Sequence, residues 1–135
     1  MKVIVDTCVW SLALRRNTVE NNPYIEELKS LIEEIRVQMI GPIRQELLSG
    51  IKSKQQFDTL KLHLEPFEDI ELEAKDYELA AEYFNAARNK GILGSNTDFL
   101  ICAISSRRKI SILTTDKDFT NFQAIFPISL HVPRD

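Results

Sequence analysis

Short apolar runs of strand length alternate with longer helical patterns along the chain, and this alternation constrains the fold more than any other feature. Strands separated by helices favour a parallel sheet whose faces are covered by those helices, because each crossover returns the chain to the same end of the sheet. The sequence therefore predicts the α/β class. The five runs are Val3–Val5, Val37–Ile40, Leu64–Phe67, Ile110–Leu113 and Ile128–Val132.

Four segments between these runs have the periodicity of helices. Apolar residues recur every three or four positions in Tyr24–Ile35, and an Asn-Pro pair before this segment is typical of a helix start. The predicted helix Ala74–Lys90 ends at Gly91. Phe99–Ile104 is apolar nearly all round, so we expect a helix that is buried on most sides. The remaining predicted helix is Pro42–Ile51.

Four acidic residues lie where an open α/β sheet collects its ligands, beyond the carboxyl ends of the strands. Asp6 directly follows the first apolar run, and Asp116 follows the run Ile110–Leu113 after two threonines. Glu46 lies in the helix after the second run, and Asp98 lies in the first turn of the buried helix. Four carboxylates in one crevice repel one another, and a divalent cation removes that repulsion. Ligation by oxygen alone selects Mg²⁺ or Mn²⁺ over zinc.

Each of these acids also has a structural explanation that needs no ligand. Asp98 and Ser95 form a capping-box pattern before an apolar run. Asp116 suits the N-cap of a helix that follows it, and a lone Glu at the flank of an apolar face, such as Glu46, is usually solvated. Asp6 is the hardest to explain in this way, because turn chemistry does not ask for an acid after that strand. Since all four explanations would have to hold together, we favour the metal site.

Each acid belongs to a short motif. The motifs are Val5-Asp6-Thr7-Cys8-Val9-Trp10, Glu46-Leu47-Leu48-Ser49-Gly50, Asp98-Phe99-Leu100-Ile101-Cys102-Ala103 and Leu113-Thr114-Thr115-Asp116-Lys117-Asp118-Phe119. In this order and spacing the chain resembles the PIN-domain ribonucleases, and in particular the VapC-type toxins of bacterial and archaeal toxin–antitoxin pairs. The resemblance covers essentially the whole chain.

The resemblance implies a three-layer α/β/α sandwich with a mainly parallel sheet of about five strands, formed by residues 1–135 as one PIN-like domain. It also implies an endoribonuclease that hydrolyses RNA phosphodiester bonds with Mg²⁺ or Mn²⁺, together with a homodimer and a small cognate antitoxin protein as partners. The matched catalytic and metal-binding positions are Asp6, Glu46, Asp98 and Asp116. The accessory positions are Asp118, which ranks below those four, and the hydroxyl residues Thr7 and Thr115.

The residue types agree with metal-assisted hydrolysis. The two histidines, His63 and His131, lie outside the motifs, so we do not expect a catalytic pair of histidines. One ion would then lower the pKa of a water molecule, and a second ion, if present, would stabilise the leaving oxygen. Positive side chains can position RNA phosphates without reading sequence. The candidates are Arg15, Arg16, Lys52, Lys54, Arg107, Arg108, Lys109 and Lys117.

Arg44 falls within the apolar arc of its short helix, and we expect it either to pair with a carboxylate of the site or to snorkel to the surface. The inhibitor implied by the resemblance has a simple way to act on such a site. We expect an antitoxin tail to lie beside the helix Tyr24–Ile35 and to place an Arg on Asp6, Asp98 or Asp116, because a guanidinium can bridge two carboxylates. The apolar face of the same helix is a candidate dimer surface.

Charge and composition exclude several classes of protein. Seventeen Lys and Arg against 20 Asp and Glu give a net charge of −3, which is not the basic balance of a DNA-reading module. The chain has no signal-peptide pattern and no stretch near the ~20 apolar residues of a membrane span. Cys8 and Cys102 lie in apolar surroundings without metal-ligand spacing, so we expect reduced thiols and a cytoplasmic location.

Other α/β proteins with acids at strand ends fit the sequence less well. A receiver domain needs a phosphoacceptor Asp at the end of its middle strand, but here Asp69 comes only in the loop after Leu64–Phe67. A haloacid-dehalogenase-like phosphatase needs an Asp where Cys8 stands. The four glycines form neither a dinucleotide-binding pattern nor a P-loop. A non-catalytic PIN-like binding module remains an alternative.

Overall fold

The computed structural model describes residues 1–15 and 22–135, and its sheet has three parallel strands in the order β2-β1-β3. The strands are β1 (Val3–Val5), β2 (Val37–Gln38) and β3 (Ser111–Leu113). Isolated parallel bridges continue the pairing at both edges, from Met39 to Asp69 and from Ile112 to Leu130. The predicted α/β class with a mainly parallel sheet is confirmed.

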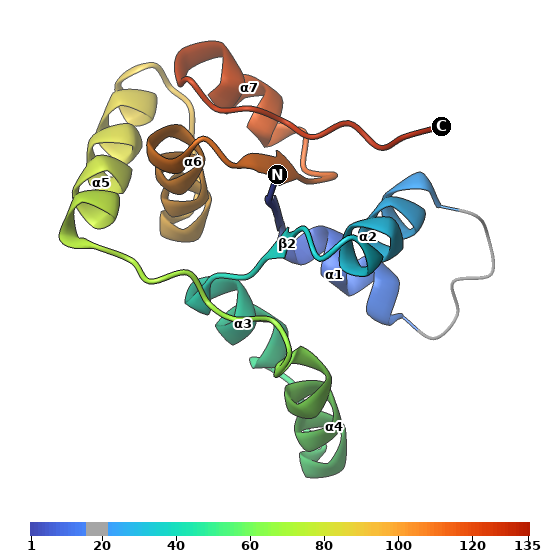
Figure 1. Cartoon of the computed structure of the whole chain (residues 1–135). Helices are drawn as coiled ribbons and strands as arrows, with labels where there is room; N and C mark the ends of the chain where they lie inside the picture. The colour runs from blue at the N-terminus through green and yellow to red at the C-terminus, as the bar shows by residue number, and fades with distance from the viewer. Residues whose placement is uncertain (16–21) are drawn as a thin grey trace.

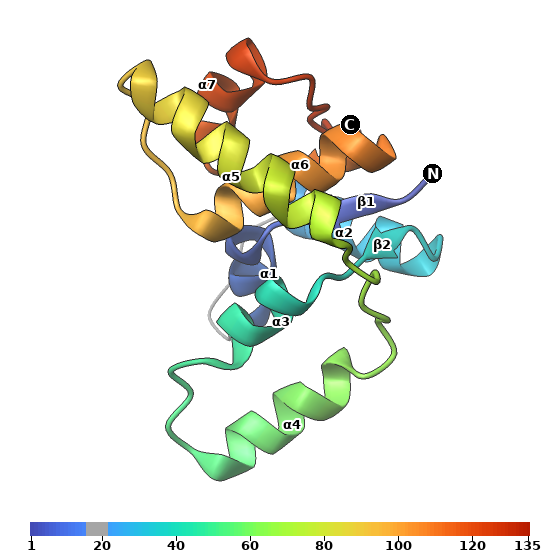
Figure 2. The ribbon, with the colours of Figure 1, turned by 90° about the vertical axis from the view of Figure 1, so that its left-hand side faces the viewer.

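Helices cover both faces of this sheet. Those in the described part of the chain are α1 (Thr7–Leu14), α2 (Pro23–Glu33), α3 (Gly41–Leu48), α4 (Lys54–Leu64), α5 (Ala74–Asn89), α6 (Asn96–Arg108) and α7 (Asp118–Ile125). In Figure 1, α5 and α6 lie on one side of the strands and α1 and α2 lie on the other, which gives three layers. In both ribbon views α4 extends away from these layers (Figures 1 and 2). Within residues 1–15 and 22–135, no helix is long and apolar enough to cross a membrane.

One predicted strand is wrong. Leu64 is the last residue of α4, and Phe67 lies in the turn that follows, so Leu64–Phe67 is not a strand. Leu64 belongs to a helical face with Phe57 and Leu60, and a short apolar run cannot by itself distinguish the end of a helix from a strand. The sheet contact expected in this region occurs instead at Asp69. The predicted strand Ile128–Val132 contributes only the bridge at Leu130.

The core is densest around α6, as the sequence predicts. Phe99 to Ile104 are all buried. The Phe99 ring meets the rings of Phe84, Phe122 and Phe126 with centroid separations of 5.5, 5.1 and 6.3 Å. Because this cluster holds the first turn of α6 against α5 and α7, it fixes the position of any residue in that turn.

The loop before α6 approaches this cluster so closely that it leaves no space for a side chain at Gly94. A Cβ there would lie 2.9 Å from the Phe122 ring and 3.0 Å from the Phe99 ring. We expect Gly94→Ala to lower the free energy of unfolding by about 1–3 kcal/mol, measured by urea denaturation, because neither buried ring can move freely. Gly41→Ala is the matched control, since its Cβ would meet nothing closer than 3.9 Å. Equal losses in the two variants would contradict this explanation.

A buried carboxylate joins α5 to α6. The side chain of Asp76 is fully buried, and its two oxygens accept hydrogen bonds from Arg107 at 2.5 Å and Arg108 at 2.7 Å. Asp76 also accepts from the backbone N–H of Glu73 at 2.8 Å, which closes a capping box at the start of α5. Burial raises the pKa of Asp76, but these hydrogen bonds outweigh that effect and lower it overall.

A second charged network ties the C-terminal segment to α2. Glu27 is 3% exposed and accepts hydrogen bonds from His131 Nε2 at 2.5 Å and Arg134 Nε at 3.0 Å. Arg134 also donates to Glu34, which in turn binds Arg36. Burial raises the pKa of Glu27, but the hydrogen bonds from His131 and Arg134 outweigh burial and lower the pKa to about 2.

The lowered pKa of Glu27 makes stability depend on pH in acid. A carboxyl whose folded-state pKa is depressed stabilises the fold above its unfolded-state pKa and loses that contribution as the pH falls through the folded-state value. For Glu27 this window runs from the ordinary value of 4.5 down to about 2. We expect Glu27→Gln to be less stable than wild type at pH 7 and the difference to shrink across this window, as measured by urea denaturation at each pH. A difference that is constant with pH would contradict the assignment.

Candidate active site

Asp6 stands at the carboxyl edge of the central strand and is 7% exposed. Its Oδ1 accepts the backbone N–H of Thr7 at 2.8 Å as the N-cap of α1, and its Oδ2 accepts the hydroxyl of Thr114 at 2.8 Å. We expected that local capping would not explain Asp6, and this expectation is wrong, because Asp6 caps the N-terminus of α1. The cap also fixes the carboxylate at the sheet edge.

Thr114 contacts two of the predicted acids and is a residue of the candidate site that the sequence-based prediction missed. It donates to Asp6 and accepts the backbone N–H of Asp116 at 3.0 Å, so one hydroxyl joins two of the predicted acids. The contact between Thr114 and Asp6 follows from the register of β1 against β3. Val5 and Leu113 are opposite one another in β1 and β3, so the residues that follow them face each other across the edge. Thr115, the hydroxyl residue predicted for this loop, instead uses its backbone N–H to contact Cys8 Sγ at 3.4 Å.

Asp98 lies in the first turn of α6 and is half-buried. The predicted capping box is present: Asp98 Oδ2 accepts the Ser95 backbone N–H at 3.0 Å, and Ser95 Oγ accepts the Asp98 N–H at 3.1 Å. This arrangement uses one carboxylate oxygen and leaves Oδ1 without a hydrogen-bond partner among the described residues. The capping role and a ligand role are therefore compatible.

Glu46 and Asp116 complete the predicted quartet from two other elements. Glu46 is exposed on α3, and its Oε1 accepts the hydroxyl of Thr7 at 2.6 Å, which joins α3 to α1. Asp116 lies in the loop after β3, and its Oδ1 accepts the backbone N–H of Asp118 at 2.9 Å. Asp118 contributes this N–H, while its exposed carboxylate contacts none of the other four acids in the described structure.

The electrostatics connect all four carboxylates through Asp98. Burial raises the pKa of Asp98, and the negative charges of Asp116 and Glu46 raise it further. Burial also raises the pKa of Asp6, with a smaller contribution in the same direction from Asp98. The thiol of Cys102 beneath them has a pKa well above its usual range, because burial and the charges of Asp98 and Asp6 both disfavour a thiolate. The site is thus a region of concentrated negative charge.

The donor set fits a hard divalent cation in its chemistry. The four acids and their threonine partners offer only oxygen atoms. A cation would stabilise the charged forms of Asp6 and Asp98, which burial, and to a smaller extent repulsion between the carboxylates, disfavours. In the described structure, however, the four carboxylates do not form a complete coordination shell for a metal ion. Across residues 1–15 and 22–135, no group of three or more His, Cys, Asp or Glu side chains is placed to hold a metal ion. The carboxylates therefore gather within electrostatic range and would have to close further to bind a cation.

Three of the eight predicted phosphate-binding residues form ion pairs elsewhere. Arg107 and Arg108 bind the buried Asp76, and Lys54 pairs with Asp58 at 2.9 Å on an exposed face of α4. Arg16 lies outside the described residues. The candidates that remain exposed without an ion pair in the described structure are Lys52, Lys109 and Lys117.

Arg44 does not pair with any of the four predicted acids. Its guanidinium binds Asp69 at 2.9 Å and the backbone carbonyls of Leu64, at 2.9 Å, and Phe67. It therefore holds the end of α4 and the following turn against α3. The expectation of a pair with a site carboxylate is wrong.

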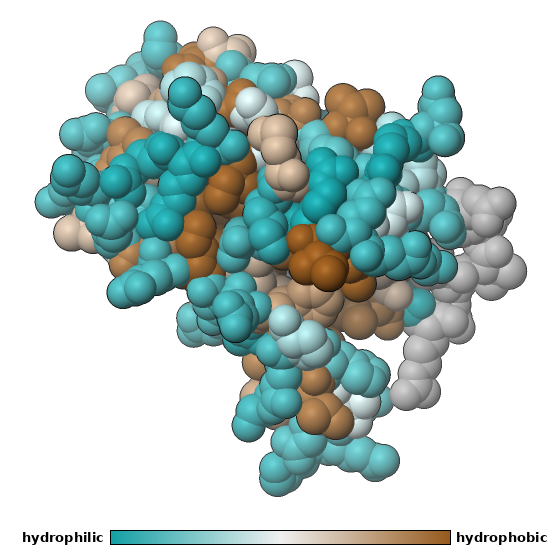
Figure 3. All heavy atoms as spheres, in the orientation of Figure 1, coloured by the Kyte–Doolittle hydropathy of each residue, from teal (hydrophilic) through white to brown (hydrophobic). Residues whose placement is uncertain are grey.

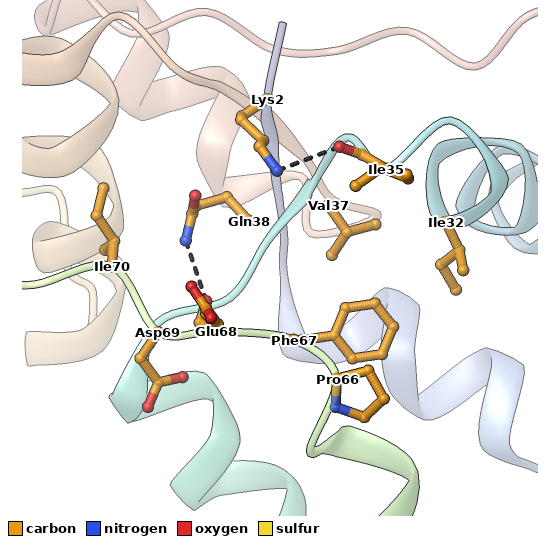
Figure 4. Close-up of a pocket in the computed structure, with 10 residues that line it drawn as sticks. All are labelled: Lys2, Ile32, Ile35, Val37, Gln38, Pro66, Phe67, Glu68, Asp69 and Ile70. Atoms are coloured by element: carbon orange, nitrogen blue, oxygen red, sulfur yellow. Dashed lines mark hydrogen bonds between the residues drawn. The ribbon is translucent and has the colours of Figure 1, made fainter.

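A cavity of about 610 Å³ lies beside β2, away from the predicted acids (Figure 4). Ile32, Val37 and Phe67 contribute to its apolar wall, and the Lys2 ammonium donates to the Ile35 carbonyl oxygen at 3.1 Å. Figure 3 shows an apolar area on this face, between β2 and α2. Because the cavity has none of the predicted site residues, we place the candidate chemistry at the carboxylate edge of the sheet.

Comparison with known proteins identifies the class. A sequence model of the PIN domain matches residues 3–125, so the chain belongs to the PIN-domain family. The receiver and phosphatase alternatives are therefore set aside. A search of the curated proteins finds no match.

Solved VapBC and FitAcB structures share the fold. VapBC2 from Rickettsia felis, in a crystal structure bound to a DNA fragment from their promoter, is 21% identical with a TM-score of 0.76, and the match covers 97% of this chain and 98% of that one. FitAcB from Neisseria gonorrhoeae is also 21% identical, with a TM-score of 0.76 and 97% coverage of both chains. VapBC-1 from nontypeable Haemophilus influenzae is 13% identical, with a TM-score of 0.73 and 97% coverage of both chains. This chain is thus similar in fold to VapC-type PIN toxins.

Proposed function

We propose that this protein is an endoribonuclease that depends on Mg²⁺ or Mn²⁺, acting as the toxin of a toxin–antitoxin pair in the cytoplasm, with residues 1–135 as its single catalytic domain. The observation that carries the proposal is the electrostatic coupling of four carboxylates from four elements, with Asp98 coupled to the other three. Membership of the PIN-domain family supports a nuclease. The absence of histidines from the four acidic motifs favours metal over histidine chemistry.

In this mechanism Asp6 and Asp98 would be the central ligands of a divalent cation, and Glu46 and Asp116 would hold it or its water from the sides. When bound there, the cation would supply a lowered pKa for a water molecule and charge stabilisation at the leaving oxygen. Thr114 orients Asp6 by hydrogen bonding and holds the backbone of Asp116, while Thr7 orients Glu46. Partners that orient ligands in this way limit the rotamers that the carboxylates can adopt.

The test of this function is incubation of purified protein with total RNA, with and without Mg²⁺ or Mn²⁺, followed by mapping of the new RNA ends. The proposal requires cleavage at defined positions that needs the added cation and stops with excess EDTA. Cleavage that persists in EDTA would exclude the metal mechanism. Binding of RNA without cleavage under all these conditions would support the alternative of a non-catalytic PIN-like module.

We also propose an antitoxin protein that inhibits by placing an Arg among the carboxylates. The support is the concentrated negative charge of the site and the likeness of the fold to VapBC and FitAB complexes. A guanidinium can bridge two carboxylates with paired hydrogen bonds, so it would compete with a cation for the same oxygens. Raising Mg²⁺ or Mn²⁺ should therefore weaken inhibition by the cognate antitoxin. An affinity that is indifferent to metal and to every Arg→Ala change in the antitoxin would refute this mode of inhibition.

Finally, we propose that the chain forms a homodimer through the apolar end of α2. Ile35 is 79% exposed and Ile32 is 39% exposed, beside the cavity of Figure 4. Ile35 also has a φ of +56°, a conformation that is strained for a β-branched residue. Ile35→Asn relieves this strain and removes the apolar side chain, so it should give a monomer that is no less stable. Light scattering that gives about 15.5 kDa for the wild type at micromolar concentration would refute the dimer.

A further inference from the structure

A second cavity, of about 210 Å³, opens beside the candidate active site. It is enclosed by the start of α2, the loop after β3, the exposed side of α7 and the C-terminal segment. Asp116 itself forms part of its wall, and so do Tyr24, Lys117 and His131. A nucleotide next to Asp116 would therefore lie beside this cavity.

We propose that this cavity is a subsite for one unstacked base of single-stranded RNA, next to the phosphate that is cleaved, with Tyr24 as the residue that the base stacks on. The inference rests on the proposed ribonuclease function and adds a residue-level basis for substrate choice. Single-stranded RNA is commonly bound by placing splayed bases on aromatic side chains. The small volume suits one ring system rather than a stacked duplex.

The walls combine an apolar surface with polar groups that have no partner within the described residues. The Tyr24 ring is half-buried, and Leu130 and Pro133 extend the apolar surface beside it. In the described part of the chain, the side-chain hydroxyls of Tyr24, Thr115 and Thr120 make no hydrogen bond, and the Lys117 ammonium makes no ion pair. A base offers donors and acceptors to such hydroxyls on its edge, and an adjoining phosphate suits the exposed Lys117.

Hydrogen bonds hold the walls of the cavity in place. The backbone N–H of His131 donates to the carbonyl of Ile112 at 2.7 Å, which fixes the C-terminal wall along β3. The His131 ring is held by the buried Glu27, and the backbone N–H of Tyr24 is held by Asn22 at 2.8 Å. A preformed wall lowers the entropic cost of ordering the site when a ligand binds.

The test compares an intact RNA oligonucleotide with versions that each lack one base. After the cleavage position has been mapped, the base on each side of the cleaved bond is removed in turn to give abasic substrates. Tyr24→Leu should lower kcat/KM for intact RNA roughly 5- to 150-fold, the range expected for loss of one base–aromatic stack. Removing the contacted base should lower kcat/KM of the wild type by a similar factor. Tyr24→Leu acting on that abasic RNA should cost little more.

Three controls separate a stacking role from a structural one. Tyr24→Phe keeps the ring and should retain most of the activity. Tyr77→Leu changes a tyrosine on α5 that is 54% exposed and lies outside this cavity, so it should leave both substrates unaffected. Thermal unfolding reports whether Tyr24→Leu is folded, because Tyr24 also packs against the core. A Tyr24→Leu loss that is equal for intact and abasic RNA would overturn the proposal.

The binding readout distinguishes failure of this inference from failure of the proposed function. Fluorescence anisotropy with intact and abasic oligonucleotides measures the Kd without any cleavage. If the wild type does not cleave RNA but binds intact RNA more tightly than abasic RNA in a Tyr24-dependent way, the nuclease proposal fails and the subsite stands. If it cleaves RNA and Tyr24→Leu changes nothing, the subsite alone fails. If Tyr24→Leu weakens only inhibition by the antitoxin, the cavity belongs to the protein partner and the RNA subsite is refuted.

Discussion

Replacing Asp98 by Asn should abolish RNA cleavage while leaving the protein folded. Loss of a residue that only orients a metal ligand already costs about 10- to 100-fold in metal affinity or activity, so loss of a central ligand should cost more than about 100-fold in kcat/KM. The fold should survive because an Asn side-chain oxygen can still accept the Ser95 backbone N–H and keep the capping box. Removing one negative charge also relieves the repulsion from Asp116 and Glu46. Asp6→Asn should behave in the same way.

The comparison needs an acid outside the site and a measurement of folding. Asp58→Asn is a matched control, because Asp58 is exposed on α4 and pairs only with Lys54 in the described structure. It should cleave RNA at the wild-type rate. Cleavage by Asp98→Asn at that same rate, with the variant folded by thermal unfolding, would remove Asp98 from the mechanism. Unfolding of the variant would show instead that the capping role dominates, and the Asp6→Asn result would then decide whether the acids act in catalysis.

Removing the buried carboxylate of Asp76 should destabilise the protein far more than removing an exposed one. Asp76→Ala leaves the partly buried Arg107 and Arg108 with only the exposed Glu73 in ion-pair range, and breaking a buried ion pair on one side typically costs about 3–5 kcal/mol. It also removes the acceptor for the Glu73 N–H at the start of α5. The free energy of unfolding from urea denaturation measures the loss.

An exposed ion pair gives the matched control for this prediction. Asp58→Ala breaks the Lys54–Asp58 pair on α4, and exposed pairs of this spacing contribute only about 0.3–0.5 kcal/mol. A loss at Asp76 as small as that at Asp58 would mean that water replaces the carboxylate at no cost. The triple variant Asp76→Leu with both arginines changed to Met should recover part of the stability, because a well-packed apolar substitute can replace a buried ionic cluster.

The fold could largely be predicted from the sequence because its strongest signals are local and periodic. The helix Ala74–Asn89 with its stop at Gly91, and the buried helix around Phe99–Ile104, follow from patterns that a single element fixes. Helix α4 was missed because it buries only Leu64, so it has little apolar periodicity to detect. The apolar run at the end of α4 was therefore predicted as the strand Leu64–Phe67.

The candidate site could be proposed from residue types, but its contacts could not be predicted. Asp6 and Asp116 were proposed from their places after strands, and Asp98 from its place in the first turn of a buried helix. Thr114 was missed because its role depends on strand register, and the register of β1 against β3 cannot be read from either strand alone. Asp76 was missed for a similar reason. Its main partners are Arg107 and Arg108 on another helix, and this contact cannot be read from the residues around Asp76 in the sequence.

The hydrogen bonds of Arg44 at the end of α4 affect how easily this helix detaches from the rest of the protein. Leu64 is the one fully buried residue of α4, all of which is described, and Leu60 packs against the core only in part. Few other contacts hold this helix besides the bond of Arg44 to the Leu64 carbonyl. Segments with few buried contacts detach from a native protein at a lower free energy than the core. The backbone amides of α4 should therefore exchange with solvent hydrogen as a cooperative group, well ahead of those in α6. We expect α4 to open locally while the carboxylate edge of the sheet stays intact.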